Sequence, residues 1–474
     1  MTNTQQPDAA KPSTLAELRA SGWRSGSVRE ELRRNVIARI ASGRPIVEGV
    51  LGFEDTIVPQ LENALIAGHD MILLGERGQA KSRLIRSLVE LLDEWMPVLA
   101  GSEINDDPYH PVSRHARQLI EELGDLAPIS WVHRSDRYGE KLATPDTSIA
   151  DLIGEVDPIK VAEGRYLSDE LTIHYGLVPR TNRGIFAINE LPDLAERIQV
   201  GLLNVLEERD IQIRGHRVRL PLDILLVASA NPEDYTSRGR IITPLKDRFG
   251  AQIRTHYPYE VETEVAIVHQ EARRVEVEGV VVAVPAFMSE IVARLSQAAR
   301  DSSRINQRSG VSVRVSIANY ETLVATSIRR AVRLGEDRAV PRPSDLDALV
   351  SSTIGKVEIE IVEGDEDIEV IQQLVRAGGL QTYREHAASE RAAEIVEAFE
   401  DGRVVEVGAE TPSSEYVTLA AELPALAELA SGVVGAEAPP GEVASAVELV
   451  LEGLHLSRRL NKDVTGGRVS YRAR

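Results

Sequence analysis

Cysteine is absent from the 474 residues, which excludes disulfide bonds, thiolate metal sites and a cysteine nucleophile. Aromatic residues make up only 4% of the chain, whereas hydrophobic residues reach 43% and charged residues 27%, as in ordinary globular proteins. No apolar run approaches the roughly 20 residues of a membrane-spanning helix, and the N-terminal stretch has no signal-peptide core. We therefore expect a cytoplasmic protein with no membrane span.

Positive charge is in deficit, because 54 Lys and Arg residues stand against 74 Asp and Glu residues. The formal net charge is -20 and the sequence pI is about 5.1. Such a balance argues against binding nucleic acid through a basic face, so we expect no general nucleic-acid binding. The length predicts two to four domains.

A glycine-rich stretch, MILLGERGQAKS at residues 71–82, is the most informative part of the sequence. Its apolar start predicts a strand, and a helical pattern follows over residues 83–92. In this order, backbone N–H groups of the turn and of the helix N-terminus converge on phosphate oxygens. In the pattern G-x-x-x-x-G-K-[ST], Lys81 would reach the β- and γ-phosphates and the Ser82 hydroxyl would bind Mg²⁺. Ala80 replaces the second glycine of the pattern, and the alternative is a surface turn with a solvated lysine.

We therefore predict ATP and Mg²⁺ as cofactors. The predicted nucleotide-binding residues are Gly75, Glu76, Arg77, Gly78, Gln79, Ala80, Lys81 and Ser82.

Two further apolar runs, at residues 184–188 and 223–229, predict buried strands that end in polar residues. The carboxyl ends of parallel strands face the ligand crevice, where a phosphate-loop enzyme needs a metal-site acid and a residue that orients the attacking water. Glu190 fits the second role. Asn189 stands where an aspartate is usual. We therefore predict that Ser82 and Asn189 form a metal site that binds Mg²⁺ more weakly than a site with an aspartate would. Asn231 follows the other strand and could bond the water or the γ-phosphate, although strand ends also carry asparagines for turn reasons.

Other segments predict elements around these strands. Residues 29–40, 56–67 and 191–208 read as helices, and residues 211–221 read as a hairpin whose basic residues contact a partner or are simply solvated. Residues 93–130 are irregular and polar, which predicts a surface insertion. Near the C-terminus, residues 432–441 predict a flexible linker, followed by a helix over residues 444–460 and a basic tail.

Four segments occur in an order that resembles a known family: GERGQAKS, GLVPRTNRGIFAINE, ASANPED and TPLKDRFG. Over residues 46–346 the chain is similar to the ATPase small subunit of magnesium chelatase and to the wider MoxR group of AAA+ proteins. This resemblance implies an α/β AAA+ P-loop NTPase core with a parallel sheet, a helical lid domain and a mainly helical C-terminal extension. The expected boundaries are a disordered tail at 1–27, the core at 28–258, the lid at 259–350 and an extension of unknown role at 351–474.

The resemblance also implies roles for single residues. Glu190 matches the catalytic glutamate, Asn231 matches the asparagine that senses the γ-phosphate, and Arg248 matches the arginine finger inserted into the next subunit. Arg314 matches the second sensor arginine of the lid and would bind nucleotide. Asn189 departs from the family's usual aspartate, which bears on the rate of hydrolysis more than on binding.

By this resemblance the protein is an ATPase, converting ATP and water to ADP and phosphate, that works in a homo-oligomeric ring of six subunits to remodel a partner. The typical partner in the family is a protein with a von Willebrand A domain. One alternative is the ATPase subunit of a magnesium or cobalt chelatase in tetrapyrrole biosynthesis. Another is a nucleotide-binding scaffold with little hydrolysis. Transcription activation is weaker, since the sequence shows no helix-turn-helix segment.

Overall fold

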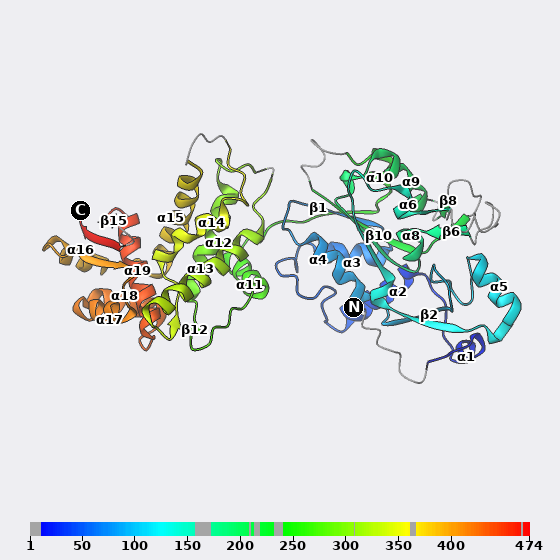
Figure 1. The fold of residues 1–474 in the computed structure, drawn as a ribbon, viewed down its shortest axis with the longest axis horizontal. Helices are drawn as coiled ribbons and strands as arrows, with labels where there is room; N and C mark the ends of the chain where they lie inside the picture. Colours follow the sequence, from blue (N-terminus) through cyan, green and yellow to red (C-terminus); the bar gives the residue numbers. More distant parts are fainter. Residues whose placement is uncertain are drawn as a thin grey trace. The chain divides into compact units, whose positions relative to one another are not determined.

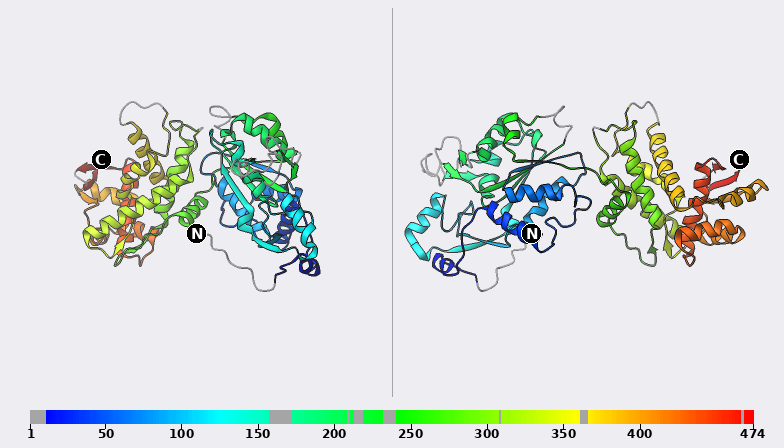
Figure 2. Two further views of the ribbon diagram at one scale, coloured as in Figure 1. Left: turned by 45° about the vertical axis from the view of Figure 1, so that its right-hand side comes forward. Right: turned by 180° about the vertical axis from the view of Figure 1, so that it is seen from behind.

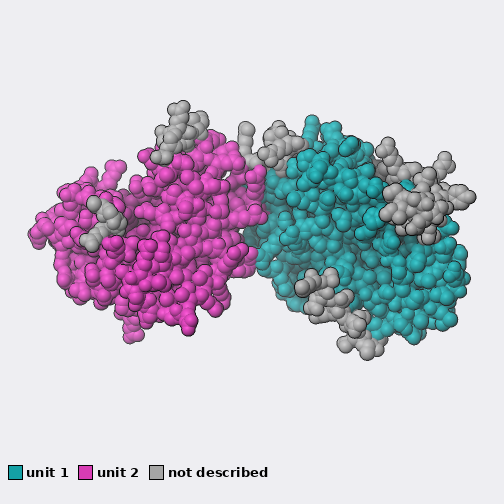
Figure 3. Space-filling model, in the orientation of Figure 1, with its two compact units in different colours: residues 1–76, 80–256 teal, residues 77–79, 257–474 magenta. Residues whose placement is uncertain are grey.

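The computed structural model describes residues 11–156, 172–207, 210–212, 219–231, 240–307, 309–360, 366–465 and 468–474. These residues group into two compact units, coloured teal and magenta in Figure 3. The first unit runs to Glu76 and from Ala80 to His256, and the second comprises Arg77–Gln79 and Tyr257–Arg474. Among the described residues, no helix combines the length and the apolar character needed to cross a membrane.

A five-stranded sheet forms the centre of the first unit (Figure 1). Its strands lie in the order β11 (Ala251–Arg254), β1 (Met71–Leu74), β10 (Ile224–Ala230), β7 (Gly184–Asn189) and β4 (Tyr138–Leu142). Every neighbouring pair is parallel, so the carboxyl ends of all five strands meet at one edge. The predicted α/β fold with a parallel sheet is confirmed, and the strand predicted at residues 71–74 is β1.

Helices cover both faces of this sheet, as strands with continuous apolar sequences require. Helices α2 (Val28–Ala41), α3 (Val58–Ala67) and α4 (Lys81–Ser87) pack on one face, and α9 (Glu196–Glu207) packs on the other. Successive strand residues alternate between the two faces, so Phe186 of β7 joins the cluster on the α9 side while both its neighbours join the opposite cluster. The helix predicted over residues 83–92 is shorter, because α4 gives way to a 3₁₀ turn after Ser87.

The N-terminal segment differs from the expected disordered tail. Helix α1 (Leu15–Ala20) begins after Thr14, whose side chain accepts a hydrogen bond from the backbone of Glu17. Leu15 and Leu18 are buried in a small cluster with residues of the segment that follows α4. The predicted disorder of residues 1–27 is therefore wrong over this helix, because its two leucines pack against apolar residues far along the chain. Residues 1–10 lie outside the described part.

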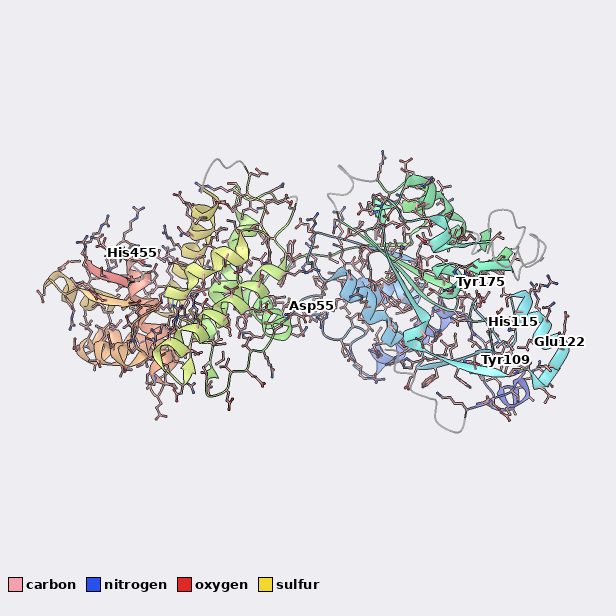
Figure 4. All side chains as sticks on the ribbon, viewed as in Figure 1. Asp55, Tyr109, His115, Glu122, Tyr175 and His455 are labelled. Carbon is pink, nitrogen blue, oxygen red and sulfur yellow. The ribbon has the colours of Figure 1, made fainter. Side chains whose placement is uncertain are left out.

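The segment predicted as an irregular surface insertion is folded. Strands β2 (Trp95–Leu99) and β3 (Ile129–His133) pair antiparallel, and helix α5 (Arg114–Leu123) lies between them in the chain. His115 and Glu122 mark α5 in Figure 4. The polar residues before α5 serve internal hydrogen bonds: the carboxylate of Asp106, fully buried, accepts from the backbone and the hydroxyl of Ser113 at 2.8 and 2.6 Å. The polar side chains here make the hydrogen bonds of a buried turn and do not face water.

The remaining elements of the first unit are short. The predicted hairpin is present as the antiparallel pair β8 (Asp210–Gln212) and β9 (Arg219–Pro221), while Arg214, His216 and Arg217 lie outside the described residues. The others are α6 (Ile149–Leu152), β5 (Gly154–Val156), β6 (Ile173–Tyr175), α8 (Leu177–Arg180) and α10 (Thr243–Arg248).

The second unit is mainly helical, as the sequence predicts, and a single apolar core runs through it. Helices α12 (Ala286–Asp301) and α13 (Val313–Leu334) share this core with α15 (Glu366–His386) and α19 (Pro440–Leu456). The predicted boundary between a lid and an extension at residue 350 therefore does not separate two cores. The other elements are α11 (Val261–Glu271), β12 (Val281–Val282), β13 (Arg338–Ala339), α14 (Leu349–Thr353), α16 (Ala392–Glu400), β14 (Val405–Gly408), α17 (Ser413–Glu422) and α18 (Pro424–Val434).

The C-terminal segment also corrects two predictions. The linker predicted at residues 432–441 is shorter, because α18 continues to Val434 and α19 starts at Pro440. The predicted basic tail is a hairpin of β15 (Leu460–Thr465) and β16 (Arg468–Ala473), shown in red in Figure 2. Strand β16 also pairs with β14, so the last residues complete a three-stranded antiparallel sheet.

Candidate nucleotide site

The phosphate loop follows β1 at the carboxyl edge of the sheet. The backbone N–H of Gly75 donates to the carbonyl of Ala230 at 3.2 Å, which ties the start of the loop to the end of β10. Gly78 and Ala80 have φ angles of 76° and 53°, in the left-handed region. Glycine enters this region without steric cost, whereas Ala80 pays a conformational penalty of about 1 kcal/mol to begin α4 in the required geometry.

Lys81, the first residue of α4, is buried and held by three acceptors. Its Nζ donates to the carbonyls of Gly75 and Glu76 at 2.5 and 2.7 Å, and to Oδ1 of Asn231 at 2.7 Å. An ammonium group at the mouth of a loop that exposes backbone N–H groups fits a polyphosphate. Of the predicted loop residues, Arg77–Gln79 group with the second unit.

Two strand ends bring the predicted catalytic side chains together. Asn231, directly after β10, donates from Nδ2 to Oε2 of Glu190 at 2.6 Å while its Oδ1 accepts from Lys81. Glu190 follows β7 in a left-handed conformation with φ 55°, and its backbone N–H donates to the hydroxyl of Ser229 at 3.3 Å. The sequence prediction that these residues converge at one sheet edge therefore agrees with the structure. Their catalytic roles stay predictions.

Oxygen atoms suited to Mg²⁺ lie beside Lys81. Oδ1 of Asn189 accepts hydrogen bonds from the hydroxyls of Ser82, at 3.5 Å, and Ser229, at 3.2 Å. Hydroxyl and amide oxygens are hard ligands of the kind that Mg²⁺ prefers, with nucleotide phosphates and water completing the shell. The residues present therefore fit the predicted ion, and Ser82 and Asn189 are the side chains that would hold it.

Glu140 on β4 also belongs to this site, and the sequence reasoning missed it. Its Oε1 accepts a hydrogen bond from Nδ2 of Asn189, and both its oxygens are bound by the guanidinium of Arg86 at 2.8 and 2.9 Å. The hydrogen bond from Arg86 is the main cause that lowers the pKa of the Glu140 carboxyl below its usual value. The sequence offers only a weak signal for this role, an acidic residue inside the short strand YGEKL. The local sequence does not reveal that β4 pairs with β7, and that pairing is what brings Glu140 to the site.

Arg248 ends α10 on the exposed surface and pairs with Asp247 at 3.4 Å. It precedes the amino end of β11, whose first residue, Ala251, pairs with Met71 at the amino end of β1. The phosphate loop leaves the opposite end of β1, so Arg248 does not approach it along the sheet. Arg314 lies in the first turn of α13, after the N-cap Ser312, in the second unit. The assignments of Arg248 and Arg314 as finger and sensor remain predictions.

The family segment GLVPRTNRG has a structural role. The guanidinium of Arg183 donates to the carbonyl of Pro97 at 2.9 Å and lies 3.6 Å from the carboxylate of Asp107. Burial lowers the pKa of Arg183 below its ordinary value. Gly184 leaves room for the carbonyl of Arg137, which a Cβ would meet at 2.0 Å. The segment thus fastens the β2–β3 region to the strand that carries Asn189 and Glu190.

Comparison with known proteins agrees with this architecture. The family described as Sigma-54 interaction domain matches residues 163–247. The magnesium-chelatase subunit ChlI of Nostoc sp. is 30% identical over 242 residues, which cover 48% of this chain and 60% of that protein. The magnesium-chelatase 38 kDa subunit of Rhodobacter capsulatus is 27% identical over 245 residues, covering 48% of this chain and 62% of that protein. The chain thus spans about three fifths of these relatives.

A solved structure of a complex between subunits BchI and BchD of magnesium chelatase aligns with 70% of this chain and 96% of its own, at 19% identity and a TM-score of 0.36. A likeness this low carries no functional conclusion. The sequence relatives show that about half of the chain is similar to magnesium-chelatase subunits.

Proposed function

We propose that this homologue of the magnesium-chelatase ATPase subunits is an AAA+ ATPase that hydrolyses ATP in an oligomeric ring and uses the reaction to remodel a partner protein. The observation that carries the proposal is the hydrogen-bonded series from Lys81 through Asn231 to Glu190 at the end of the phosphate loop. A group that binds phosphate and a group that orients water are thereby connected through one amide.

The chemistry follows from what each side chain offers. Lys81 holds the β- and γ-phosphates, and Asn231 contacts the γ-phosphate from the neighbouring strand. Glu190 orients the attacking water and accepts its proton as the water oxygen bonds to the γ-phosphorus, while the bond from the γ-phosphorus to the bridging oxygen breaks and ADP leaves with that electron pair. Ser82 and Asn189 would hold Mg²⁺, which would supply positive charge to offset the charge of the phosphates. Phosphoryl transfer needs little more than such positioning and charge.

The location of Arg248 supports a role in a neighbouring subunit. Its exposed side chain lies before the amino end of β11, away from its own phosphate loop. An arginine at the γ-phosphate contributes a factor of about 10³ to 10⁵ in rate. If it is supplied in trans, activity requires assembly, and a closed ring gives each subunit one donor and one acceptor face. By analogy with AAA+ proteins, the ring has six subunits, with Arg314 as a second nucleotide contact.

The mixing of two inactive variants tests this proposal. Arg248→Ala and Glu190→Gln should each be inactive alone, whereas a mixed ring places an intact Arg248 beside an intact Glu190. Random mixing at equal amounts should restore about a quarter of the sites. Wild-type turnover should rise faster than linearly with protein concentration. Arg19→Ala, which removes an exposed arginine from a surface ion pair, is the control and should keep wild-type activity.

Two results would contradict the proposal. Mixtures that stay inactive would show that Arg248 does not act in trans. Nucleotide binding without any turnover by the wild type would favour the scaffold function, for which the amide at position 189 is the specific argument.

The chelatase function is the second candidate, and sequence similarity to the chelatase subunits is the observation that favours it. The two functions differ in the partner. A remodelling ATPase of this group is expected to bind a protein with a von Willebrand A domain, and a chelatase subunit is expected to support metal insertion into a tetrapyrrole. ATP-dependent formation of a metalloporphyrin in a reconstituted chelatase would decide for the second.

A further inference from the structure

We propose that Glu140 is a positioning residue for the metal site: held by Arg86, it orients the amide of Asn189 so that the amide oxygen faces the expected metal position. The inference rests on the proposed function, because it concerns the Mg²⁺ that accompanies the nucleotide. It assigns a purpose to an asparagine that otherwise weakens this site.

The four residues form two adjacent contacts between α4 and the sheet. Glu140 lies beside Ala187 in the β4–β7 register, and Asn189 is two residues further along β7, so both side chains are on the sheet face that α4 covers. Ser82 and Arg86 are four residues apart on α4 and therefore share one side of the helix. Two strand residues and one helical turn advance by similar distances, about 6 Å, which allows both contacts to form at once.

The chemistry of these contacts fixes which way the Asn189 amide faces. An ionised carboxylate can only accept hydrogen bonds, and both oxygens of Glu140 are engaged by Arg86. The NH₂ group of Asn189 must therefore be the part that meets Glu140. Its oxygen then faces the hydroxyls of Ser82 and Ser229, where the metal is expected.

Without the Glu140 carboxylate, the Asn189 amide can turn and present its NH₂ group to the metal position. The partial positive charge of that NH₂ group would repel a cation. Glu140 thus prevents this unfavourable orientation of the amide. The hydroxyl of Tyr138 donates to Oε2 of Glu140 at 3.0 Å and restrains it further. Groups that orient a metal ligand in this way typically change metal affinity by about 10- to 100-fold.

A consequence distinguishes this arrangement from a simple defect at position 189. Asn189→Asp alone would place two carboxylates within hydrogen-bond distance, so they would repel or share a proton. In the double variant Glu140→Gln with Asn189→Asp, the amide is on β4 and the carboxylate is on β7, the reverse of the wild type. The glutamine NH₂ then donates to the aspartate, and the pair again contains one amide and one carboxylate.

The test measures the Mg²⁺ concentration that half-saturates binding of a fluorescent ATP analogue. Glu140→Gln should raise this concentration about 10- to 100-fold. Asn189→Asp should fail to lower it, and the double variant should return to within about threefold of wild type. Affinity for the same analogue in EDTA should stay within about twofold throughout, because loop contacts to phosphate are untouched. Glu90→Gln, which breaks the surface pair with Arg134, is the matched control.

Several outcomes would overturn the inference. It fails if Asn189→Asp alone lowers the Mg²⁺ requirement, if Glu140→Gln behaves like Glu90→Gln, or if the losses of the two single variants add in the double variant. Thermal unfolding of each ligand-free variant checks that it is folded.

Failure of the inference can be told from failure of the proposed function. A wild type that binds no nucleotide contradicts both. A wild type that binds nucleotide with Mg²⁺ and hydrolyses it, while the variants show no compensation, contradicts only the role of Glu140.

Discussion

Asn231 lies between Lys81 and Glu190 and bonds both, accepting from the lysine Nζ at 2.7 Å and donating to the glutamate Oε2 at 2.6 Å. One amide therefore sets the positions of a cation and an anion that the proposed reaction uses at the same phosphate. Because an amide has one donor end and one acceptor end, neither an aspartate nor a lysine at position 231 could satisfy both neighbours.

Asn231→Ala should lower ATP turnover by about 10²-fold, the scale typical of removing one donor from a preorganised site. Nucleotide affinity should change by only a few-fold, because Lys81 and the loop remain. Steady-state turnover and equilibrium binding of the same nucleotide separate the two effects. Asn461→Ala, whose side chain bonds within the C-terminal hairpin, is the control. Equal losses in binding and turnover would assign Asn231 to the loop's structure.

Glu31→Gln should destabilise the first unit by about 3 kcal/mol, because it leaves a buried arginine without its charge partner. The side chain of Arg137 has no exposed surface and pairs with both oxygens of Glu31, at 2.8 and 2.6 Å. Urea unfolding of Glu31→Gln and of the control Glu90→Gln measures the loss in the free energy of unfolding. Glu90→Gln breaks an exposed pair and should cost less than about 1 kcal/mol. Similar losses in both variants would show that Arg137 is stabilised chiefly by its two hydrogen bonds to the backbone carbonyl of Arg183.

The second unit should lose stability at alkaline pH through Tyr416. Burial, with the adjacent Glu448, raises the pKa of this phenol far above its ordinary value. The unfolded chain releases the proton near pH 10, whereas the folded chain keeps it. The unfolded state then binds fewer protons, so stability is present below pH 10 and falls as pH rises beyond it.

Tyr416→Phe should reduce the slope of unfolding free energy against pH between pH 10 and 11.5 by about 1.4 kcal/mol per pH unit. The variant will be less stable at pH 7, because it loses the hydrogen bond to Glu448, so the slope is the informative quantity. Tyr259→Phe, at a position 71% exposed, should keep the wild-type slope. An unchanged slope in Tyr416→Phe would assign the alkaline loss to other groups.

Gly453→Ala should destabilise the second unit by about 1 to 3 kcal/mol, although alanine favours helices over glycine. A Cβ at this position of α19 would meet the ring of Tyr383 at 2.0 Å, so α15 or the ring must shift. Gly432→Ala in α18 is the matched control, since its Cβ would meet nothing within 4 Å and should stabilise by about 0.5 to 1 kcal/mol. Thermal unfolding of both variants should give shifts of opposite sign. A gain in both would mean that Tyr383 moves freely.

The parts of the site that the sequence predicted are those whose chemistry is local. A glycine turn before Lys81, and polar residues at the ends of two apolar strands, each carry their signal within about ten residues. The role of Glu140 was not predicted, because it depends on which strand lies beside β7 and in what register the two strands pair. That pairing joins segments some fifty residues apart, and no periodicity within YGEKL reports it.

The same reason explains the errors in the fold. Leu15 and Leu18 looked like isolated apolar residues in a polar tail, because their partners on β2 and β3 come about 80 to 110 residues later. Asp106 looked like surface polarity, because its hydrogen bonds to the next turn cannot be recognised from composition. The helix predicted at residues 444–460 corresponds to α19, which begins four residues earlier and ends at Leu456, whereas the sharing of one core between residues 259–350 and 351–474 was not predicted.

That shared core limits how the C-terminal half can be modified. Cutting the chain after residue 350 would strip α15 from α12 and α19 from α15, and buried core residues of α12 such as Ile291 would face water. Residues 351–474 are therefore not an appendage that can be trimmed for crystallisation or exchanged between homologues. A useful chimera would exchange everything from Tyr257 to Arg474 together, because these residues fold around one core.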